Sequence, residues 1–290
     1  MNCNHIELNN KIDEVKNIMI KTCPLLCEND GEILKKGKFY RSKLALIIGE
    51  NKIPVSILAA IELTHSASLF HDDVIDEEIN RRGDISPNIL YGNKRAVLLG
   101  DYFLSQAVRF INEREEKIIR MIYSDVLIDL AWGELVHQSI QNQGDLSFEK
   151  YKEIVVKKTG SLFGFAGFCG MFFLNQGHSP EKIVSLFNKV GMLYQFLDDC
   201  IDYLSKLEKS DEENGYITFP IFIAVKEMNL NIFLGLSQKE KEAFFNHHQI
   251  LEKSYLYIRK EYESLVNELK FYHFNPELFE ALNEIFKRIY

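Results

Sequence analysis

The chain has 290 residues, of which 46% are hydrophobic and 12% aromatic, so it can form a large core and is neither disordered nor fibrous. Its formal net charge of -8 excludes broad electrostatic attraction to nucleic acid or to an anionic membrane. Any anion that the protein binds therefore needs a local cationic pocket.

Apolar residues recur at three- and four-residue spacing along most of the sequence, and Pro and Gly are few, at 6 and 16. This pattern is typical of packed amphipathic helices and predicts an all-α fold. We expect helices at residues 6–20, 39–49, 54–78, 93–111, 115–143, 148–175, 180–204, 217–228, 238–270 and 276–288.

Helix-start signals support these boundaries. Pro follows a capping residue at Ser179-Pro180 and Asn275-Pro276, and Ser237 with Glu240 forms a capping box. No Gly-, Ser- or Pro-rich linker interrupts the series, so residues 1–290 are predicted to form one domain.

The cysteines predict a reducing compartment, the cytoplasm. They are odd in number, scattered, and preceded by no signal peptide. The longest uncharged apolar run, residues 161–174, is shorter than the about 20 residues that a membrane span needs. It is predicted to be a buried core helix, and no transmembrane segment is expected.

A short acidic motif occurs twice. His71 to Asp76 (HDDVID) lies near the end of the expected 54–78 helix, and Asp198 to Asp202 (DDCID) near the end of the 180–204 helix. Aspartates four residues apart share one helix face, where they repel each other unless a cation is bound. Carboxylates suit Mg²⁺, which also takes phosphate oxygens, so two such faces can clamp one diphosphate. A single copy would be equally compatible with an exposed helix end, but two copies favour the metal.

Basic residues lie before, between and near the two acidic motifs. Lys36 to Arg41 precede the first acidic motif, Arg81 and Arg82 follow it, and Lys158 comes before the second. Arg suits bidentate phosphate contacts and Lys supplies a point charge. Each of these residues taken alone is more often a solvated surface charge. It is their order along the chain that indicates pockets for anions.

In these segments the sequence resembles the trans-isoprenyl (polyprenyl) diphosphate synthase family, of the long-chain type such as octaprenyl or heptaprenyl diphosphate synthase. The resemblance spans residues 36–220 and rests on five segments in order: Gly37–Arg41, His71–Asp76 with Arg81–Gly83, Gly92-Asn93 with Gly100-Asp101, Lys158-Thr159, and Tyr194–Asp202. It implies the isoprenoid synthase fold, a bundle of about ten or more helices around a central prenyl-chain tunnel.

The resemblance also implies roles for individual residues. Three Mg²⁺ ions per active site would be held by Asp72, Asp73, Asp76, Asp198 and Asp202. Isopentenyl diphosphate would be bound by Lys38, Arg41, His65 and Arg82. An allylic diphosphate, such as farnesyl or geranyl diphosphate, would be bound by Arg81, Lys158, Thr159 and Gln195. The residues expected to carry catalysis are Asp72, Asp76, Lys158 and Asp198.

Three positions in the matching segments and helices also have a purely structural interpretation. A lone His65 is typical of a core histidine, and Asn93 and Asp101 are interpreted as helix-end structure rather than as ligands.

The implied reaction is ionisation of the allylic carbon–oxygen bond, attack by the isopentenyl double bond and loss of a proton. The family pattern implies that bulky aromatics at positions 67 and 68 stop chain growth early. Ala67 and Ser68 are small, so a medium- to long-chain all-trans product is expected. Ile128 and Trp132 are candidates for the tunnel floor, with core packing as the alternative.

The chain departs from the family pattern at Lys36, where a Gly is usual, and at Phe39 and Ser42, which replace an Arg and a Pro. It also departs at Tyr216, which stands where a Lys is usual. The loop before Tyr216 is shortened and expected to be mobile. Three other functions remain open: a non-catalytic or regulatory subunit of a heteromeric synthase, a class I terpene cyclase, and a non-enzymatic metal binder. Both aspartate motifs favour an elongating synthase, which the resemblance implies is a homodimer.

Overall fold

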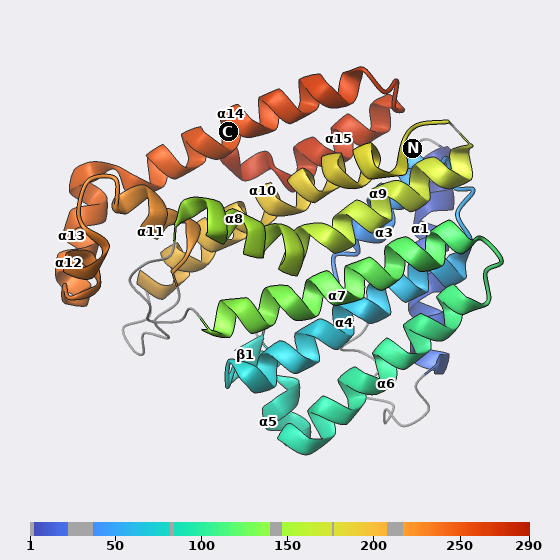
Figure 1. The fold of residues 1–290 in the computed structure, drawn as a ribbon, viewed down its shortest axis with the longest axis horizontal. Coiled ribbons are helices and arrows are strands. Elements are labelled where there is room, and N and C mark those ends of the chain that lie inside the picture. Colours follow the sequence, from blue (N-terminus) through green and yellow to red (C-terminus); the bar gives the residue numbers. More distant parts are fainter. Residues whose placement is uncertain (1–2, 23–36, 82–83, 140–146, 176, 208–216) are drawn as a thin grey trace. The chain divides into compact units, whose positions relative to one another are not determined.

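The computed structural model describes residues 3–22, 37–81, 84–139, 147–175, 177–207 and 217–290 (Figure 1). These residues form an all-α fold, as predicted, apart from a pair of two-residue antiparallel strands, β1 (Asn80–Arg81) and β2 (Asp84–Ile85). None of the helices in these ranges is long and apolar enough to cross a membrane.

The chain divides into two compact units. Unit 1 consists of Met1–Val126 and Phe165–Ile183, and unit 2 of Leu127–Gly164 and Val184–Tyr290. The single domain expected from the sequence stays a prediction.

Unit 1 is organised around one buried helix. Its helices are α1 (Cys3–Thr22), α3 (Tyr40–Ile48), α4 (Val55–Ile75), α5 (Pro87–Tyr91), α6 (Asn93–Asn112), the first part of α7 (Lys117–Ser139) and most of α9 (Ser161–Leu174). Every residue from Ile57 to Thr64 is buried, as expected for a helix surrounded on all sides. In Figure 1, α4 runs alongside α6, and the rings of Phe70 and Phe103 meet edge to face at 5.2 Å.

Unit 2 contains the rest of the helices. They are α8 (Phe148–Val155), the π-helical turn η1 (Val156–Gly160), most of α10 (Pro180–Leu207), α11 (Phe219–Ala224), α12 (Leu230–Leu234), α13 (Gln238–His248), α14 (Ile250–Lys270), α15 (Pro276–Ile285) and the 3₁₀ turn η2 (Lys287–Ile289). The predicted starts are confirmed: α10 and α15 begin at Pro180 and Pro276, and Ser237 and Glu240 form the capping box of α13.

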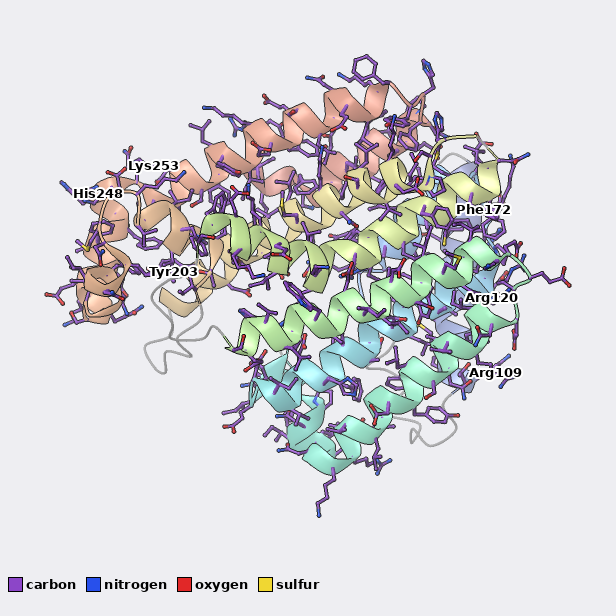
Figure 2. The ribbon with its side chains drawn as sticks, in the orientation of Figure 1. Arg109, Arg120, Phe172, Tyr203, His248 and Lys253 are labelled. Carbon is purple, nitrogen blue, oxygen red and sulfur yellow. The ribbon has the colours of Figure 1, made fainter. Side chains whose placement is uncertain are left out.

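The sequence predicts two long continuous helices that are each interrupted in the structure, so these two predictions are wrong. Residues 148–175 contain the π-helical turn η1 between α8 and α9, and residues 238–270 are divided at Gln249, which has a left-handed backbone (φ 52°). Figure 2 shows His248 and Lys253 at the second break. Both approach Glu227, and the ammonium group of Lys253 forms an ion pair with it. Gln249 is neither Gly nor Pro, and in η1 only the last residue, Gly160, is a glycine, so the sequence does not indicate a break at either place.

Other elements were not expected. The strand pair and the five-residue helices α5 and α12 are too short to show a periodic pattern. Core packing, the alternative role for Ile128, is wrong because this side chain is 64% exposed. Trp132 is half-buried, and Lys150 and Lys157 lie over its ring, 4.5 and 4.9 Å from the ring centroid.

Candidate active site

The first acidic motif lies at the C-terminal end of α4 in unit 1. Asp72 is in the last turn, and Asp76 is the capping residue, whose N–H donates to the Asp72 carbonyl at 2.8 Å. The side chains of Asp72 and Asp76 are half-buried, whereas that of Asp73 is fully buried. A helix C-terminus carries partial negative charge, so carboxylates gathered there are unfavourable unless a cation compensates them. This position fits a bound cation.

His71 attaches this end of α4 to α6. Its Nε2 lies 3.2 Å from Asp101 Oδ1 and 3.3 Å from the Val97 carbonyl. A Cβ atom at Gly100 would lie 2.4 Å from the His71 ring, so only glycine permits this approach. Asn93 is the first residue of α6, as interpreted, but Asp101 lies inside the helix, and the interpretation as helix-end structure is wrong for it.

The basic segment before α3 has an unusual backbone. Phe39 is buried and left-handed (φ 54°), Lys38 beside it is exposed, and Arg41 is half-buried in the first turn of α3. Ser42 is buried and donates to the Glu62 carboxylate twice, from its hydroxyl at 2.6 Å and from its backbone N–H at 3.1 Å. Glu62 on α4 thus fixes the start of α3.

His65, Ala67 and Ser68 lie further along α4. His65 is half-buried and precedes Asp72 by two turns; its carbonyl accepts the hydroxyl of Ser68 at 2.8 Å. Ala67 is buried and Ser68 half-buried. Lys36, Arg82 and Tyr216 lie outside the described residues, and Arg81 is described only as the end of β1.

The second acidic motif lies on α10 in unit 2, where the side chains differ sharply in exposure. Asp202 is exposed and Asp198 half-buried, but Asp199 is 8% exposed. Its surroundings are aromatic: Phe196 and Phe219 stack at 4.3 Å, and Tyr151 lies parallel to Phe196 at 5.7 Å.

Asp199 ends a chain of hydrogen bonds that starts in η1. The hydroxyl of Thr159 donates to Gln195 Oε1 at 2.9 Å, and Gln195 Nε2 donates to Asp199 Oδ1 at 2.9 Å. The other oxygen of Asp199 accepts from the Phe219 N–H at 2.9 Å and from the Tyr151 hydroxyl. Two predicted anion-binding residues, Thr159 and Gln195, are thereby connected to the second motif.

Burial dominates the electrostatics of this chain of hydrogen bonds. Burial raises the pKa of Tyr151 well above its ordinary value, and the charge of Asp199 raises it further, so the phenol keeps its proton and donates. Burial also raises the pKa of the Asp199 carboxyl, while its donors Tyr151, Gln195 and Phe219 favour the ionised form.

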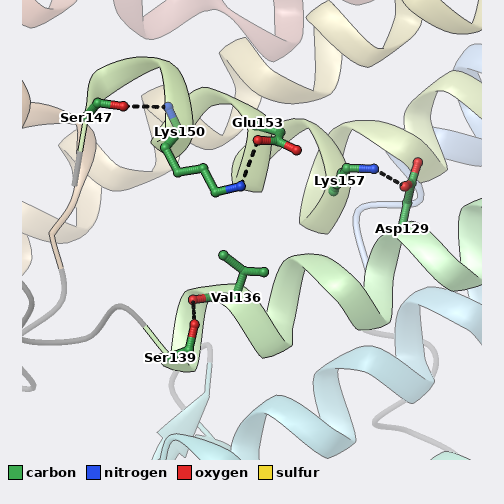
Figure 3. Close-up of polar contacts among 7 residues, drawn as sticks. All are labelled: Asp129, Val136, Ser139, Ser147, Lys150, Glu153 and Lys157. Atoms are coloured by element: carbon green, nitrogen blue, oxygen red, sulfur yellow. Dashed lines mark hydrogen bonds and ion pairs between the residues drawn. The ribbon is translucent and has the colours of Figure 1, made fainter. Parts of the chain in front are cut away.

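The η1 turn, which carries Lys157, Lys158 and Thr159, packs against α7 in unit 2. Lys157 forms an ion pair with Asp129 (Figure 3), and Lys158 one with Glu134. A Cβ atom at Gly133 would lie 2.8 Å from the Lys158 backbone nitrogen, which explains the glycine there. Burial would raise the pKa of Glu134, but the charge and hydrogen bond of Lys158 and the amide of Gln138 lower it below its ordinary value.

The predicted site residues therefore fall into two groups. Unit 1 holds those on α3 and α4, and unit 2 holds Lys158, Thr159, Gln195, Asp198 and Asp202. Within the described ranges, no three His, Cys, Asp or Glu side chains lie together as a metal site. Sequence reasoning missed Asp199, Tyr151, Glu62 and Glu134. Only Asp199 carried a signal, its place inside the repeated motif.

Solved structures define the class of fold. The chain resembles a decaprenyl diphosphate synthase from Rhodobacter capsulatus with a TM-score of 0.84 and 20% identity, covering 98% of this chain and 97% of that one. It resembles a polyprenyl synthase from Caulobacter crescentus, complexed with calcium and isoprenyl diphosphate, with a TM-score of 0.81 and 19% identity, covering 97% and 94%. These similarities show that the chain has the all-α isoprenoid synthase fold.

Sequence comparison gives the family. The model of the polyprenyl synthetase family matches residues 29–252, so the chain belongs to this family. It is 37% identical over 176 residues to the nonaprenyl diphosphate synthase of Mycobacterium tuberculosis, covering 58% of this chain. This match spans about half, 52%, of that relative's length.

Proposed function

We propose that the protein is a prenyltransferase that condenses isopentenyl diphosphate with an allylic diphosphate, such as farnesyl or geranyl diphosphate. The product would be a medium- to long-chain all-trans polyprenyl diphosphate. The observation that carries the proposal is the chain of hydrogen bonds in unit 2, because it joins Thr159 and Gln195 to the acidic motif of α10. The amide of Gln195, a donor for an anion, is thus held on the same helix as the proposed cation ligands Asp198 and Asp202, in a chain of the matching family.

The carboxylates fit a divalent metal, which this family uses. Asp72, Asp73 and Asp76 on α4 and Asp198 and Asp202 on α10 are the proposed ligands, for three Mg²⁺ ions. In the described structure the carboxylates do not gather in threes. This suits Mg²⁺, which keeps several waters and takes one or two carboxylates together with phosphate oxygens. The bound metal would supply positive charge that stabilises the departing diphosphate.

The remaining residues would hold the two substrates. Lys158, with Thr159, Gln195 and Arg81, would bind the allylic diphosphate, and Lys158 would stabilise the charge that develops when the carbon–oxygen bond breaks. Isopentenyl diphosphate would be held by Lys38, Arg41, His65 and Arg82. Lys38 is exposed, and the contact of Glu62 with Ser42 fixes the turn that carries Arg41.

Ala67 and Ser68 are proposed to set the product length. They lie one turn before Asp72 on α4, and small side chains there would let the growing chain pass.

The protein is proposed to act as a homodimer in the cytoplasm. Large apolar side chains are exposed along α7 at seven-residue steps, Met121, Ile128 and Leu135, and on α6 at Leu98. Exposed apolar groups at every second turn of one helix face support a protein interface. The free thiols of Cys169 and Cys200 agree with a reducing compartment.

The test is incubation of purified protein with Mg²⁺, labelled isopentenyl diphosphate and farnesyl or geranyl diphosphate, followed by chromatography of the products. A metal-dependent series of prenyl diphosphates is expected, and its longest member gives the product length. In the Asp72→Ala variant, product should fall by about 100-fold or more. Folded wild-type protein that yields no product with either starter would instead support a non-catalytic subunit, and a cyclised hydrocarbon would support a terpene cyclase.

A further inference from the structure

Asp199 differs from the other two aspartates of its motif. We propose that it is a positioning residue, not a metal ligand. It would orient Gln195 toward the allylic diphosphate, with Thr159 held against Gln195, and fix the start of α11. The inference rests on the function proposed above and adds a residue that acts through its neighbours.

The contacts of Asp199 occupy three of the about four acceptor positions of its carboxylate. Its Oδ1 accepts from Gln195, and its Oδ2 accepts from Tyr151 and Phe219. The stacked rings of Phe196 and Phe219 help to bury it, whereas Asp202 on the same helix is exposed. An ion at Asp199 would have to displace these donors and lose its own water, which is costly in an apolar environment.

The carboxylate determines the direction of the hydrogen-bond chain. Both oxygens of the Asp199 carboxyl accept hydrogen bonds, so the amide nitrogen of Gln195 faces Asp199 and its oxygen faces Thr159. Thr159 then donates its single proton to Gln195. The amide nitrogen of Gln195 carries a second hydrogen, and this is the donor that we assign to a diphosphate oxygen.

The contact with Phe219 extends the same control to another element. Phe219 is the first residue of α11, and the first N–H groups of a helix have no partner within the helix. Asp199 supplies that partner from α10, and its negative charge suits a helix N-terminus. One carboxylate therefore sets both the orientation of Gln195 and the point where α11 begins.

The principal test is the Asp199→Asn variant. The Phe219 N–H can only donate, so the new amide must turn its oxygen toward Phe219 and its nitrogen toward Gln195. Gln195 must then invert, so that its amide nitrogen faces the Thr159 hydroxyl, which accepts instead of donating, and the second hydrogen of that amide no longer faces the diphosphate. We expect the KM for the allylic diphosphate to rise by about 10–100-fold while the Mg²⁺ concentration for half-maximal activity stays unchanged. Asp198→Asn, in a proposed metal ligand, should raise that Mg²⁺ concentration.

A milder pair of variants covers the case in which Asp199→Asn does not fold. Tyr151→Phe removes one of the three donors and should raise the KM for the allylic diphosphate by about 3–10-fold. Tyr262→Phe is the matched control, because this buried tyrosine of unit 2 donates to Asn283 at 2.7 Å, outside the hydrogen-bond chain. Both variants should lower thermal stability, but Tyr262→Phe should leave the KM unchanged.

Two results would overturn the inference. One is a rise in the required Mg²⁺ concentration for Asp199→Asn as large as that for Asp198→Asn, which would make Asp199 a ligand. The other is an equal KM for Tyr151→Phe and Tyr262→Phe.

Calorimetric titration with inorganic pyrophosphate and Mg²⁺ separates this inference from the proposed function. Wild-type protein that binds pyrophosphate but forms no product refutes only the prenyltransferase, and weaker binding by Tyr151→Phe than by Tyr262→Phe still supports the positioning role. Wild-type protein that neither binds pyrophosphate nor forms product overturns both the proposed function and the positioning role of Asp199.

Discussion

Lys158 has a carboxylate partner of its own in Glu134, in addition to its proposed role at the diphosphate. The pair joins η1 to α7, and Glu134 is the more buried of the two side chains. A buried carboxylate that keeps its charge depends on its cation, so each partner stabilises the charged form of the other. Lys158 is therefore held in place before any anion arrives.

This pairing predicts a pH dependence of stability. The pKa of Glu134 is lower in the folded chain than in the unfolded one, so its contribution is complete above the unfolded value and is lost as the pH falls through the folded value. Urea unfolding between about pH 5 and about pH 3.5 should show a smaller loss of unfolding free energy for Glu134→Gln than for wild type. Glu153→Gln, at an exposed ion pair with Lys150, is the control and should follow wild type. Equal losses for Glu134→Gln and wild type would contradict the prediction.

Among single residues, the sequence predicted those that belong to the repeated acidic motif or to the ordered series of basic segments. Both motifs could be read from spacing alone. The buried partners could not, because Glu62 and Glu134 lie in helical patterns where a charged residue is usually solvated, and only tertiary contacts bury them. For Asp199, spacing places the residue in the motif but does not show that its side chain turns inward.

At the scale of the elements, the start of α3 depends on one contact, that of Ser42 with Glu62. Ser42 stands where the family pattern has Pro, and Pro has no N–H. In this chain the hydroxyl and the N–H of Ser42 both bind the buried carboxylate of Glu62. The departure from the family pattern therefore comes with a capping contact that Pro could not make.

Ser42→Ala should lower the free energy of unfolding by about 1–3 kcal/mol, because the Glu62 carboxylate would lose a buried donor. Urea unfolding measures the change. Ser105→Ala is the control, because this serine on α6 also donates a hydrogen bond from its hydroxyl but is exposed. Its acceptor is the Asp101 backbone carbonyl, at 2.8 Å. It should change stability by less than about 0.5 kcal/mol. Similar values for the two variants would mean that the contact with Glu62 does not stabilise α3.

Long periodic helices were predictable, and their interruptions were not. The helix at 93–111 was predicted within one residue of α6, because its apolar face repeats over five turns. The π-helical turn η1 changes the period for only five residues, and the break at Gln249 uses a residue type that usually continues a helix. Such features depend on packing around them: Gly160 at the end of η1 permits a close approach to Asn188, and Gln249 gives no compositional signal.

For the whole molecule, the exposed apolar residues of α6 and α7 bear on assembly. Ile128 is 64% exposed and Leu135 is 72% exposed, and both lie on one face of α7. Burial of these side chains would favour association with a second copy of the chain.

Sedimentation velocity should find the wild type as a dimer and Leu135→Asp as a monomer, because a buried carboxylate without a partner opposes association. Leu256→Asp on α14, at a leucine that is 49% exposed, is the control and should remain a dimer. Monomeric wild type, or a dimer that persists in Leu135→Asp, would contradict the proposed interface.

Trp132 is the only tryptophan in the 290 residues, so the indole emission of the protein comes from one place. Two ammonium groups lie over its ring, and one of them belongs to Lys157, next to the proposed diphosphate-binding residues of η1. Positive charge over an indole interacts with its π electrons, so any anion that draws these lysines away changes the electronic environment of the ring. The unlabelled protein thus contains its own optical reporter of anion binding at η1.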